Sequence, residues 1–214
     1  MCLLLAANVI ILPNNVKRFF LLLLSGIVAG STAMAEAPKK DLEKATFAGG
    51  CFWCMQPVYD KLLGVVSTTV GYTGGLKPNP TYDEVSTGKT GHYEAIEVVY
   101  DPAKISYQEL LNAFWKSVDP TNDAGQFADL GPQYRTAIFY HNEGQKSEAF
   151  ASKEKLATSG KFDGPIITEI KAFSKFYSAE EYHQKYYLKN AGHYYLYKVG
   201  SGREGFLKKA WGDK

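Results

Sequence analysis

This sequence of 214 residues is organised around one stretch, Gly49-Gly50-Cys51-Phe52-Trp53-Cys54. It follows a strand-like run, Ala45–Ala48, and precedes a segment with the pattern of a helix. A pair of glycines lets the backbone approach a ligand closely and adopt dihedral angles that other residues avoid. Two cysteines three positions apart share a helix face, so their thiols can meet. The spacing fits a short-range disulfide or half of a zinc site, but the two aromatics between the cysteines favour a reactive pair.

The residues on either side predict a β-α-β-β-α-β order. Runs rich in β-branched and aromatic residues predict four strands, at Ala45–Ala48, Val65–Val70, Tyr93–Tyr100 and Tyr134–Tyr140. The first helix carries the cysteines and is expected to stop near Gly64, and the Ser106–Glu109 capping box opens the second. The second helix has one apolar stripe, made by Tyr107, Leu110, Leu111, Phe114, Trp115 and Val118. We therefore predict an α+β fold, a two-layer plait with a ferredoxin-like core.

The rest of the chain predicts C-terminal helical and coil additions to this core. A helix is expected near Gln145–Thr158, a short strand around Ile166–Ile170, and a further helix opened by Ser178–Glu181. The tail from Gly192 has four glycines before Phe206 and predicts a coil that wraps over the core. Tyrosines of the last helix and tail are expected to pack against the core: Tyr182, Tyr186, Tyr187, Tyr194, Tyr195 and Tyr197.

The first 35 residues have the pattern of a secretory signal peptide. The basic pair Lys17-Arg18 precedes the apolar run Phe19–Leu24, and small residues follow up to Ala33-Met34-Ala35, an A-x-A cleavage pattern. We expect residues 1–35 to be removed by cleavage after Ala35. Residues 36–214 would then form a single domain in the periplasm or outside the cell.

An uncleaved membrane anchor is the alternative for this segment. The apolar run is short for that role, because a helix needs about 20 apolar residues to span a bilayer comfortably. The preceding residues, Met1–Asn15, are largely apolar where a signal peptide should begin with charge. A start at Val16 would give a conventional signal peptide.

Composition excludes one class of function and limits the cysteine chemistry. The formal net charge is +2 and the basic residues form no patch with interleaved aromatics, so we expect no binding of nucleic acid. Signal-peptide cleavage removes Lys17 and Arg18, which leaves 22 basic residues against 22 acidic ones. It also removes Cys2, so that the mature chain holds only Cys51 and Cys54. Any disulfide within the mature chain must join these two.

The stretch Gly-Cys-Phe-Trp at 50–53, together with Gly91-His92-Tyr93-Glu94-Ala95, resembles the peptide methionine sulfoxide reductase A family. The resemblance runs from about Ala45 to Trp211, and further matching stretches are Gly71–Gly75, Asp119–Thr121 and Gln133–Arg135. It implies a thiol-dependent reductase that converts methionine-S-sulfoxide, free or in proteins, to methionine. Family members commonly place resolving cysteines near the C-terminus, whereas this chain resembles the subset with a second cysteine inside the signature.

Sulfoxide reduction needs a nucleophile and help for the leaving oxygen. A cysteine is mostly thiol at pH 7, and a helix N-terminus stabilises negative charge by only about 0.3–1 kcal/mol. That shifts the pKa of Cys51 by less than about one unit. Glu94 shares a strand face with Ile96 and Val98, so burial should raise its pKa and let it donate a proton. The family's acid falls on the same position, which favours this role over that of a solvent-exposed strand residue.

The remaining roles follow from the resemblance and the residue types. Tyr82 and Tyr134 are phenols that can assist Glu94, and Phe52-Trp53 offer an apolar, polarizable recess for the S-methyl group of the substrate. Cys51 would become a sulfenic acid, which condenses with a nearby thiol. Cys54 is that thiol, since the mature chain has no other.

Several residues leave alternatives open. Asp129 matches a polar position of the family's site, although the neighbouring Gln126-Phe127-Ala128 departs from the commoner glycine-containing form. Asp129 and Tyr134 could equally be ordinary buried hydrogen-bonding residues. His92 could orient Glu94 but fits a surface or capping histidine better. Pro57 requires either a bend in the first helix or an irregular first turn around the cysteines.

Two other classes of protein share the cysteine pattern. A thioredoxin-like disulfide oxidoreductase also has C-x-x-C after a strand, but the bulky Phe52-Trp53 pair and the element order count against it. A zinc-binding interaction module would need a second ligand pair of suitable spacing, which His141, His183 and His193 do not provide. We expect a monomer that binds no metal and no cofactor. The resemblance implies thioredoxin, or another thioredoxin-fold dithiol, as the external reductant.

Overall fold

The computed structural model describes residues 41–212, and every structural statement below concerns this part of the chain. The signal peptide predicted at 1–35 and its cleavage site lie outside the described residues. Within residues 41–212, none of the helices has the length and apolar character that crossing a membrane requires.

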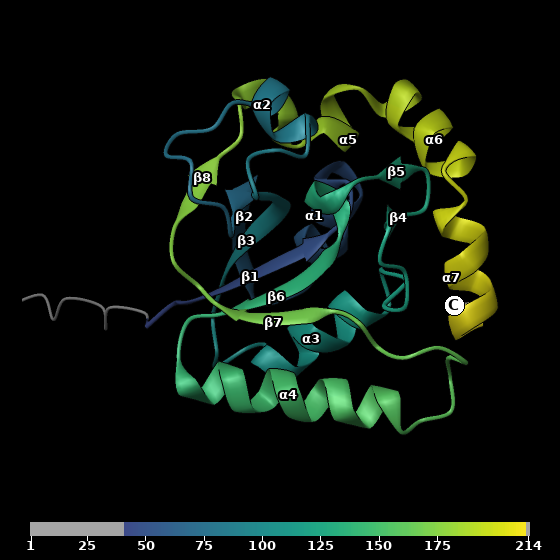
Figure 1. Ribbon diagram of the computed structural model, residues 1–214. Coiled ribbons are helices and arrows are strands. Elements are labelled where there is room, and N and C mark those ends of the chain that lie inside the picture. The colour runs from purple at the N-terminus through teal and green to yellow at the C-terminus, as the bar shows by residue number, and fades with distance from the viewer. Residues whose placement is uncertain (1–40, 213–214) are drawn as a thin grey trace, which may run out of the picture. The chain divides into compact units, whose positions relative to one another are not determined.

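A curled six-stranded sheet lies at the centre of the fold, with its strands in the order β7-β6-β1-β3-β2-β8 (Figure 1). Neighbouring strands are antiparallel, except for the parallel pair of β6 and β7. The strands are β1 Glu43–Gly49, β2 Val65–Thr73, β3 Tyr93–Tyr100, β6 Thr136–Tyr140, β7 Glu169–Ala172 and β8 Phe176–Ser178. The four predicted strands are confirmed. The fourth begins at Thr136 rather than Tyr134, because the 3₁₀ turn Pro132–Tyr134 occupies its expected start.

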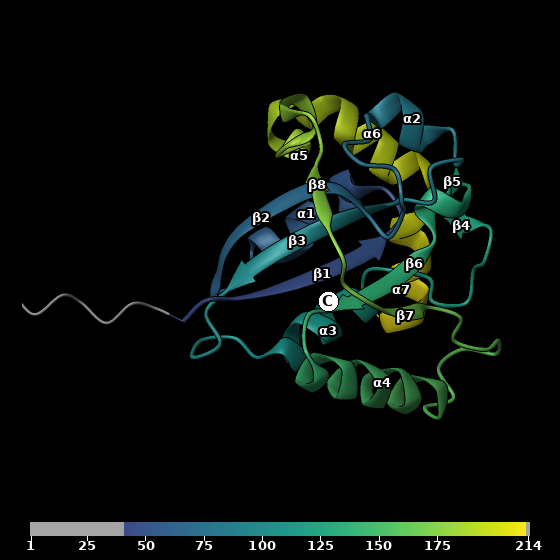
Figure 2. The same cartoon turned by 60° about the vertical axis from the view of Figure 1, so that its left-hand side comes forward.

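Two helices pack against one face of the sheet, α1 Phe52–Asp60 and α3 Tyr107–Trp115. Helix α1 ends before the predicted stop, and the turn that follows it uses Gly64 at a φ of +101°. The predicted capping box is confirmed, since Ser106 and Glu109 hydrogen-bond each other's backbone N–H groups. The predicted apolar stripe of α3 is confirmed too, because all of its residues are buried. A further helix, α4 Glu143–Ala157, lies beside α3 below the sheet, as both Figure 1 and Figure 2 show.

Strand β3 is buried on both of its faces. Ile96 and Val98 point to the helices and belong to the largest apolar cluster. Tyr93 and Ala95 point the other way, to a second cluster that aromatic side chains from the β7–β8 connection help to close. Glu94, on the face of Ile96 and Val98, is therefore removed from water, which is the condition under which a carboxyl keeps its proton.

The long loop predicted at 71–91 is shorter than expected. Strand β2 continues to Thr73, and the short helix α2 covers Tyr82–Ser86. A second capping box holds the start of α2, where the Thr81 and Glu84 side chains accept from each other's backbone N–H groups. This cap fixes the first helical residue, Tyr82, which is one of the predicted site residues.

The segment between β7 and residue 190 differs from the prediction. Strand β7 lies a few residues beyond the predicted Ile166–Ile170. The helix predicted from Ser178 is wrong: Ser178 ends strand β8, Glu181–His183 form a 3₁₀ turn, and the short helix α5 covers Tyr186–Lys189. The physical reason is that β8 pairs with β2, and that Lys185 has a left-handed φ of +54°, which interrupts a longer helix.

The coil predicted from Gly192 onward is also wrong. The segment forms two helices, α6 Ala191–Gly200 and α7 Arg203–Trp211, which run along one side of the molecule in Figure 1. Gly202, at a φ of +80°, separates them. Glycine inside a helix costs about 1 kcal/mol relative to alanine, so the local composition disfavours these helices. Tertiary contacts outweigh that cost, since Arg203 is buried and Trp211 packs against the main apolar cluster.

Candidate active site

The two glycines of the signature place Cys51 at the junction of β1 and α1. A Cβ atom on Gly50, which has a φ of +77°, would lie 2.4 Å from the Cβ of Gln126. A Cβ atom on Gly49 would lie 2.5 Å from the Sδ of Met55. The sequence suggested that these glycines leave room for a ligand, but neighbouring side chains fill that space. The pair serves close packing around the cysteine turn.

Cys51 caps helix α1 and lies just outside it. Its φ and ψ are −50° and 117°, and its carbonyl oxygen accepts from the N–H groups of Cys54, at 3.0 Å, and Met55, at 3.3 Å. Pro57 lies inside the helix. Cys51 alone lies outside the helix, while Cys54 lies in its first turn and Pro57 beyond that turn.

The two thiols are reduced, buried and coupled to each other. Cys51 is 6% exposed and Cys54 is 5% exposed. Burial raises the pKa of Cys51, and its hydrogen bond to Cys54 raises it further. That same hydrogen bond lowers the pKa of Cys54 to about 7, and the charge of Arg203 acts in the same direction. Cys54 is therefore the more acidic thiol of the pair.

Glu94 lies against the turn that carries Cys51. Its side chain is 2% exposed, and its Oε2 accepts from the backbone N–H of Phe52 at 3.0 Å. Burial raises the pKa of this carboxyl to about 8, although the Phe52 N–H opposes the shift. The raised pKa expected from the apolar strand face is confirmed. Glu94 thus carries a proton at neutral pH, and its contact with the Phe52 N–H holds it beside Cys51.

Tyr82 and Tyr134 flank Glu94 and Cys51 from two different elements. Burial and the charges of Glu94 and Cys51 raise the pKa of Tyr82 to about 12. Burial and the same two groups also raise the pKa of Tyr134, and a hydrogen bond joins the two phenols. Glu180 fixes Tyr82 by accepting from its backbone N–H at 2.9 Å. Both phenols are therefore protonated at neutral pH, and each can donate a hydrogen bond close to the Glu94 carboxyl.

Asp129 lies in a small hairpin made by β4 Gly125–Gln126 and β5 Asp129–Leu130. The hydroxyl of Tyr197 donates to its carboxylate. Burial raises the pKa of Asp129, and the Tyr197 hydroxyl and the charge of Arg203 oppose that shift. Its negative charge in turn raises the pKa of Cys51 and Glu94. Asp129 therefore lies at the site and holds Tyr197 there.

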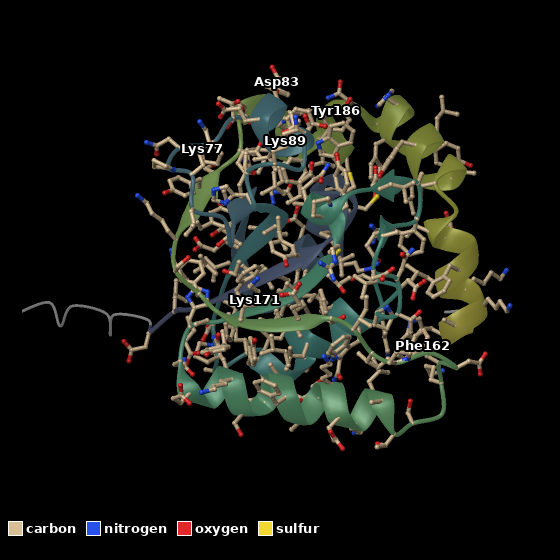
Figure 3. The ribbon with its side chains drawn as sticks, in the orientation of Figure 1. Lys77, Asp83, Lys89, Phe162, Lys171 and Tyr186 are labelled. Atoms are coloured by element: carbon tan, nitrogen blue, oxygen red, sulfur yellow. The ribbon has the colours of Figure 1, made fainter. Side chains whose placement is uncertain are left out.

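Phe52 and Trp53 lie in an aromatic cluster beside Cys51. Phe52 is buried, with ring centroids at 5.1 Å from His183 and 6.5 Å from Tyr82. Trp53 stacks on Tyr186, labelled near α5 in Figure 3, at a centroid distance of 3.9 Å. Its Nε1 donates to the Nδ1 of His183 at 3.0 Å. These contacts make the surroundings of Cys51 apolar and polarizable, and the binding of an S-methyl group there stays a prediction.

His92 has a different role from the one that its sequence position favoured. The side chain is buried, so the interpretation as a surface histidine is wrong. Its Nδ1 accepts from the N–H of Gly75 at 3.2 Å, and its Nε2 lies 2.7 Å from the carbonyl oxygen of Lys77. His92 thus ties the loop before α2 to the start of β3, and both ring nitrogens are used there.

Comparison with known proteins identifies the family of this chain. Residues 43–214 match the family described as "Peptide methionine sulfoxide reductase". The enzyme MsrA of Bacillus pumilus is 54% identical over 172 residues, which are 80% of this chain and 97% of that enzyme. MsrA of Bacillus subtilis is 52% identical over the same shares of the two chains. This chain belongs to the peptide methionine sulfoxide reductase family. It is an oxidoreductase, so the interpretation as a zinc-binding interaction module is excluded. The family match also excludes the interpretation as a thioredoxin-like oxidoreductase.

Solved structures of methionine sulfoxide reductases have the same mixed α/β fold. Methionine sulfoxide reductase A of Corynebacterium diphtheriae superposes with a TM-score of 0.64 at 36% identity, covering 72% of this chain and 77% of that one. Mxr1 of Saccharomyces cerevisiae in reduced form gives a TM-score of 0.67 at 35% identity, covering 73% of this chain and 89% of that one. Within residues 41–212, no group of three or more His, Cys, Asp and Glu side chains could hold a metal ion.

The reductase site also contains two tyrosines that sequence reasoning assigned to packing. The hydroxyls of Tyr194 and Tyr197 of α6 lie beside the sulfurs of Cys54 and Cys51, respectively. Their pKa values are raised, first by burial and then by the charges of the cysteines. Their spacing of three residues is the signal that could have identified them, because it puts both hydroxyls on one face of a helix. Tyr182 and Tyr195, by contrast, are largely exposed and pack no core.

The sequence interpretation also missed His183 in this reductase. It is buried between Phe52, Trp53 and Tyr82, with a ring centroid 4.3 Å from that of Tyr82. Because Nδ1 accepts from Trp53, the ring proton lies on Nε2. Burial lowers the pKa of His183, so the ring is neutral at neutral pH. No local sequence pattern links residue 183 to residues 52 and 82, which lie far from it in the chain.

Proposed function

We propose that this reductase uses Cys51 as the nucleophile and Glu94 as the acid in the reduction of methionine-S-sulfoxide. The observation that carries the proposal is the position of a protonated, buried Glu94 at 3.0 Å from the N–H of Phe52, next to the nucleophile. Tyr82 and Tyr134 stand beside it as neutral donors. Substrates are free methionine sulfoxide and oxidised methionine in proteins, and Phe52 and Trp53 enclose the S-methyl group.

The first step transfers the sulfoxide oxygen to the enzyme. The Cys51 thiol loses its proton, and its sulfur forms a bond to the sulfoxide sulfur while Glu94 gives the oxygen a proton and Tyr82 and Tyr134 give it hydrogen bonds. The protonated oxygen then bonds to the Cys51 sulfur, the S–O bond of the substrate and the bond between the two sulfurs break, methionine leaves, and Cys51 becomes a sulfenic acid. The sulfoxide is reduced by two electrons, and the Cys51 sulfur is oxidised by two.

The second step assigns this chain to the subset with its resolving cysteine inside the signature. The Cys54 thiolate attacks the sulfenic sulfur of Cys51, water leaves, and a Cys51–Cys54 disulfide forms. Its low pKa supports this role, since the thiolate is the attacking form. A thioredoxin-type dithiol then reduces the disulfide, with no prosthetic group, and the enzyme acts as a monomer.

Replacing Cys54 by serine tests this assignment. Cys54→Ser should release one methionine per enzyme in a single turnover and leave a sulfenic acid on Cys51 that dimedone can trap. Methionine release and dimedone labelling, measured by mass spectrometry, check both parts. Full multiple turnover of this variant with thioredoxin as sole reductant would rule out Cys54 as the resolving thiol.

Closing the disulfide should disturb the aromatic cluster. Residues i and i+3 of a helix have Cβ atoms about 5–6 Å apart, whereas a disulfide holds them near 3.5–4.5 Å. The turn with Phe52 and Trp53 should therefore move, so that the substrate fits the reduced enzyme better. Because Trp53 stacks on Tyr186, tryptophan fluorescence should change between redox states. The change should vanish in Trp53→Phe, where Trp115 and Trp211 remain. Superimposable structures of the two states across 50–57 would contradict this.

Export to the periplasm, or secretion, remains a proposal that the apolar run and the Ala33-Met34-Ala35 pattern support. We expect a mature protein that starts after Ala35 and consists of the single domain 36–214. The intact mass of the protein from its native host measures this. A mature chain that still carries Lys17-Arg18 would instead indicate a membrane anchor.

We propose that the elements β1-α1-β2-β3-α3-β6 form a ferredoxin-like two-layer plait. Support comes from the strand order β6-β1-β3-β2, from the antiparallel pairing of these strands, and from the placement of α1 and α3 in one apolar cluster.

A further inference from the structure

A cleft of about 690 Å³ lies between helices α1, α3, α6 and α7. Its walls include Pro57 and Lys61 of α1, Lys116 at the end of α3 and Trp211 of α7, and Cys54 lines it from inside. We name it the Cys54 cleft. Its volume suits a bound loop or ligand, and the mechanism proposed above makes no use of it.

Cys54 lines the Cys54 cleft, whereas Cys51 is not among the residues that line it. Within the described part of the chain, neither Cys51 nor any proposed substrate-binding residue lines the Cys54 cleft. Glu94 and Tyr197 lie beside Cys51, and Cys54 also acts on the Glu94 carboxyl. Of the two sulfurs of a Cys51–Cys54 disulfide, that of Cys54 would therefore be the one next to the cleft.

A buried cation stands beside Cys54 in this cleft. Arg203 is 4% exposed, and its guanidinium donates to the carbonyl oxygens of Ser117, at 2.6 Å, and Gly49, at 3.0 Å. The guanidinium also lies over the ring of Phe127, at 4.5 Å from its centroid. These contacts fix a positive charge in a place of low dielectric constant, where it attracts an incoming anion strongly. A thiolate is such an anion.

The rim of the cleft is basic, and elements that form it also expose apolar side chains. Four lysines line it against two glutamates, and the six are Lys61, Lys116, Lys198, Lys208, Glu109 and Glu204. Helix α6, which contributes Tyr194 and Lys198 to the cleft, exposes Tyr195, Leu196 and Val199. Beside Leu62, a wall residue, Leu63 is 91% exposed. A basic rim with exposed apolar side chains on the elements that form it suits a protein partner with an acidic face.

We infer that the Cys54 cleft is the docking site of the protein dithiol that regenerates the enzyme, and that this dithiol attacks the sulfur of Cys54, not that of Cys51. The inference rests on the proposed Cys51–Cys54 disulfide. It goes beyond that proposal by naming the surface, the charge of the partner's face and the sulfur that is attacked.

A thiolate of the partner forms a bond to the Cys54 sulfur, the Cys51–Cys54 bond breaks, and the electron pair leaves on Cys51, which takes a proton from Glu94. The partner's second thiol loses its proton to water and attacks the sulfur of its own first cysteine. Cys54 leaves as a thiolate beside Arg203. The partner is oxidised to a disulfide by two electrons, both enzyme cysteines are reduced, and solvent returns a proton to Glu94.

One factor opposes this direction of attack. The thiol of lower pKa is the better leaving group, and Cys54 has the lower pKa, which by itself favours attack on Cys51. Two other factors outweigh this difference in leaving-group pKa. Cys51 does not line the cleft, so the partner reaches Cys54 first. Glu94, with a pKa of about 8, can also protonate the Cys51 sulfur as it leaves.

Trapping the mixed disulfide tests which sulfur is attacked. Full-length enzyme is oxidised by methionine-S-sulfoxide and mixed with a thioredoxin whose second active-site cysteine is serine. The released thiol is then alkylated with iodoacetamide. Both cysteines lie on one tryptic peptide, and fragment ions assign each modification. We expect thioredoxin on Cys54 and the alkyl group on Cys51. The reverse assignment overturns the inference alone, whereas absence of the Cys51–Cys54 disulfide before mixing overturns the proposed resolving step as well.

Charge reversal on the rim tests the docking surface. The double variant Lys61→Glu and Lys116→Glu should raise the KM for thioredoxin about fivefold, and the effect should shrink at high salt. The matched control is Lys155→Glu on α4, an exposed lysine that does not line the cleft, and it should leave that KM unchanged. Equal KM values for the double variant and the control would contradict docking at this rim.

Discussion

Replacing Cys51 by serine is expected to abolish turnover with any reductant. A serine hydroxyl is not acidic enough to attack the sulfoxide sulfur and cannot take up its oxygen as a sulfenic acid. Loss of a covalent nucleophile costs on the order of 10⁶-fold in kcat in other enzymes. Methionine formation with dithiothreitol in excess measures the effect. Dithiothreitol bypasses Cys54 and the docking surface, so that only the first chemical step is tested.

Two controls separate this result from misfolding. Serine is nearly the size of cysteine, and Tyr197 offers its hydroxyl to the same position, so Cys51→Ser should unfold at a temperature close to that of the wild type. The paired variant Cys54→Ser should keep single-turnover activity in the same assay. Methionine formed by folded Cys51→Ser at the wild-type rate would assign the nucleophile elsewhere.

Replacing Glu94 by glutamine is expected to slow the chemical step by ~10²–10⁴-fold, the usual worth of general acid catalysis. The loss should be partial, because an amide can still donate a hydrogen bond to the sulfoxide oxygen. Its own oxygen can accept from the Phe52 N–H, which keeps the turn in place. Substrate binding should change much less than the single-turnover rate.

The pH dependence gives Glu94 a signature of its own. Its pKa in the folded enzyme is about 8, raised by burial, so the carboxyl is protonated below that pH and loses its proton above it. The wild-type single-turnover rate should therefore fall as the pH rises through about 8, and Glu94→Gln should lack this fall. Glu97→Gln is the matched control, since Glu97 lies on the opposite face of β3 and pairs with Lys44 at 2.9 Å. An unchanged single-turnover rate in Glu94→Gln would mean that Glu94 takes no part in the chemical step.

Local patterns predicted the centre of this fold and part of its candidate site. Strands β1, β2, β3 and β6 and helix α3 could be read from the sequence because each buries a face with a period that the chain itself shows. Glu94 could be placed for the same reason, since alternation along β3 puts it with Ile96 and Val98. Cys51 and Cys54 stand in a motif that is contiguous in sequence.

The remainder of the site depends on contacts between distant parts of the chain. Tyr194, Tyr197 and Arg203 reach the cysteines only because α6 and α7 fold back across the molecule. The glycines of this segment predicted coil, and the packing that overrides them is not encoded within the segment. His183 likewise contacts Phe52 because β8 pairs with β2, and no short-range sequence pattern predicts that pairing.

The most direct test is a titration of the reduced enzyme, without reductant, by each epimer of methionine sulfoxide in turn. The proposed chemistry predicts one methionine per enzyme from the S epimer, the loss of both thiols, and a disulfide that peptide mapping assigns to Cys51 and Cys54. It predicts no methionine from the R epimer, because the two epimers are reduced by different enzymes. Reduction of the R epimer, or methionine release that leaves both thiols free, would contradict the account.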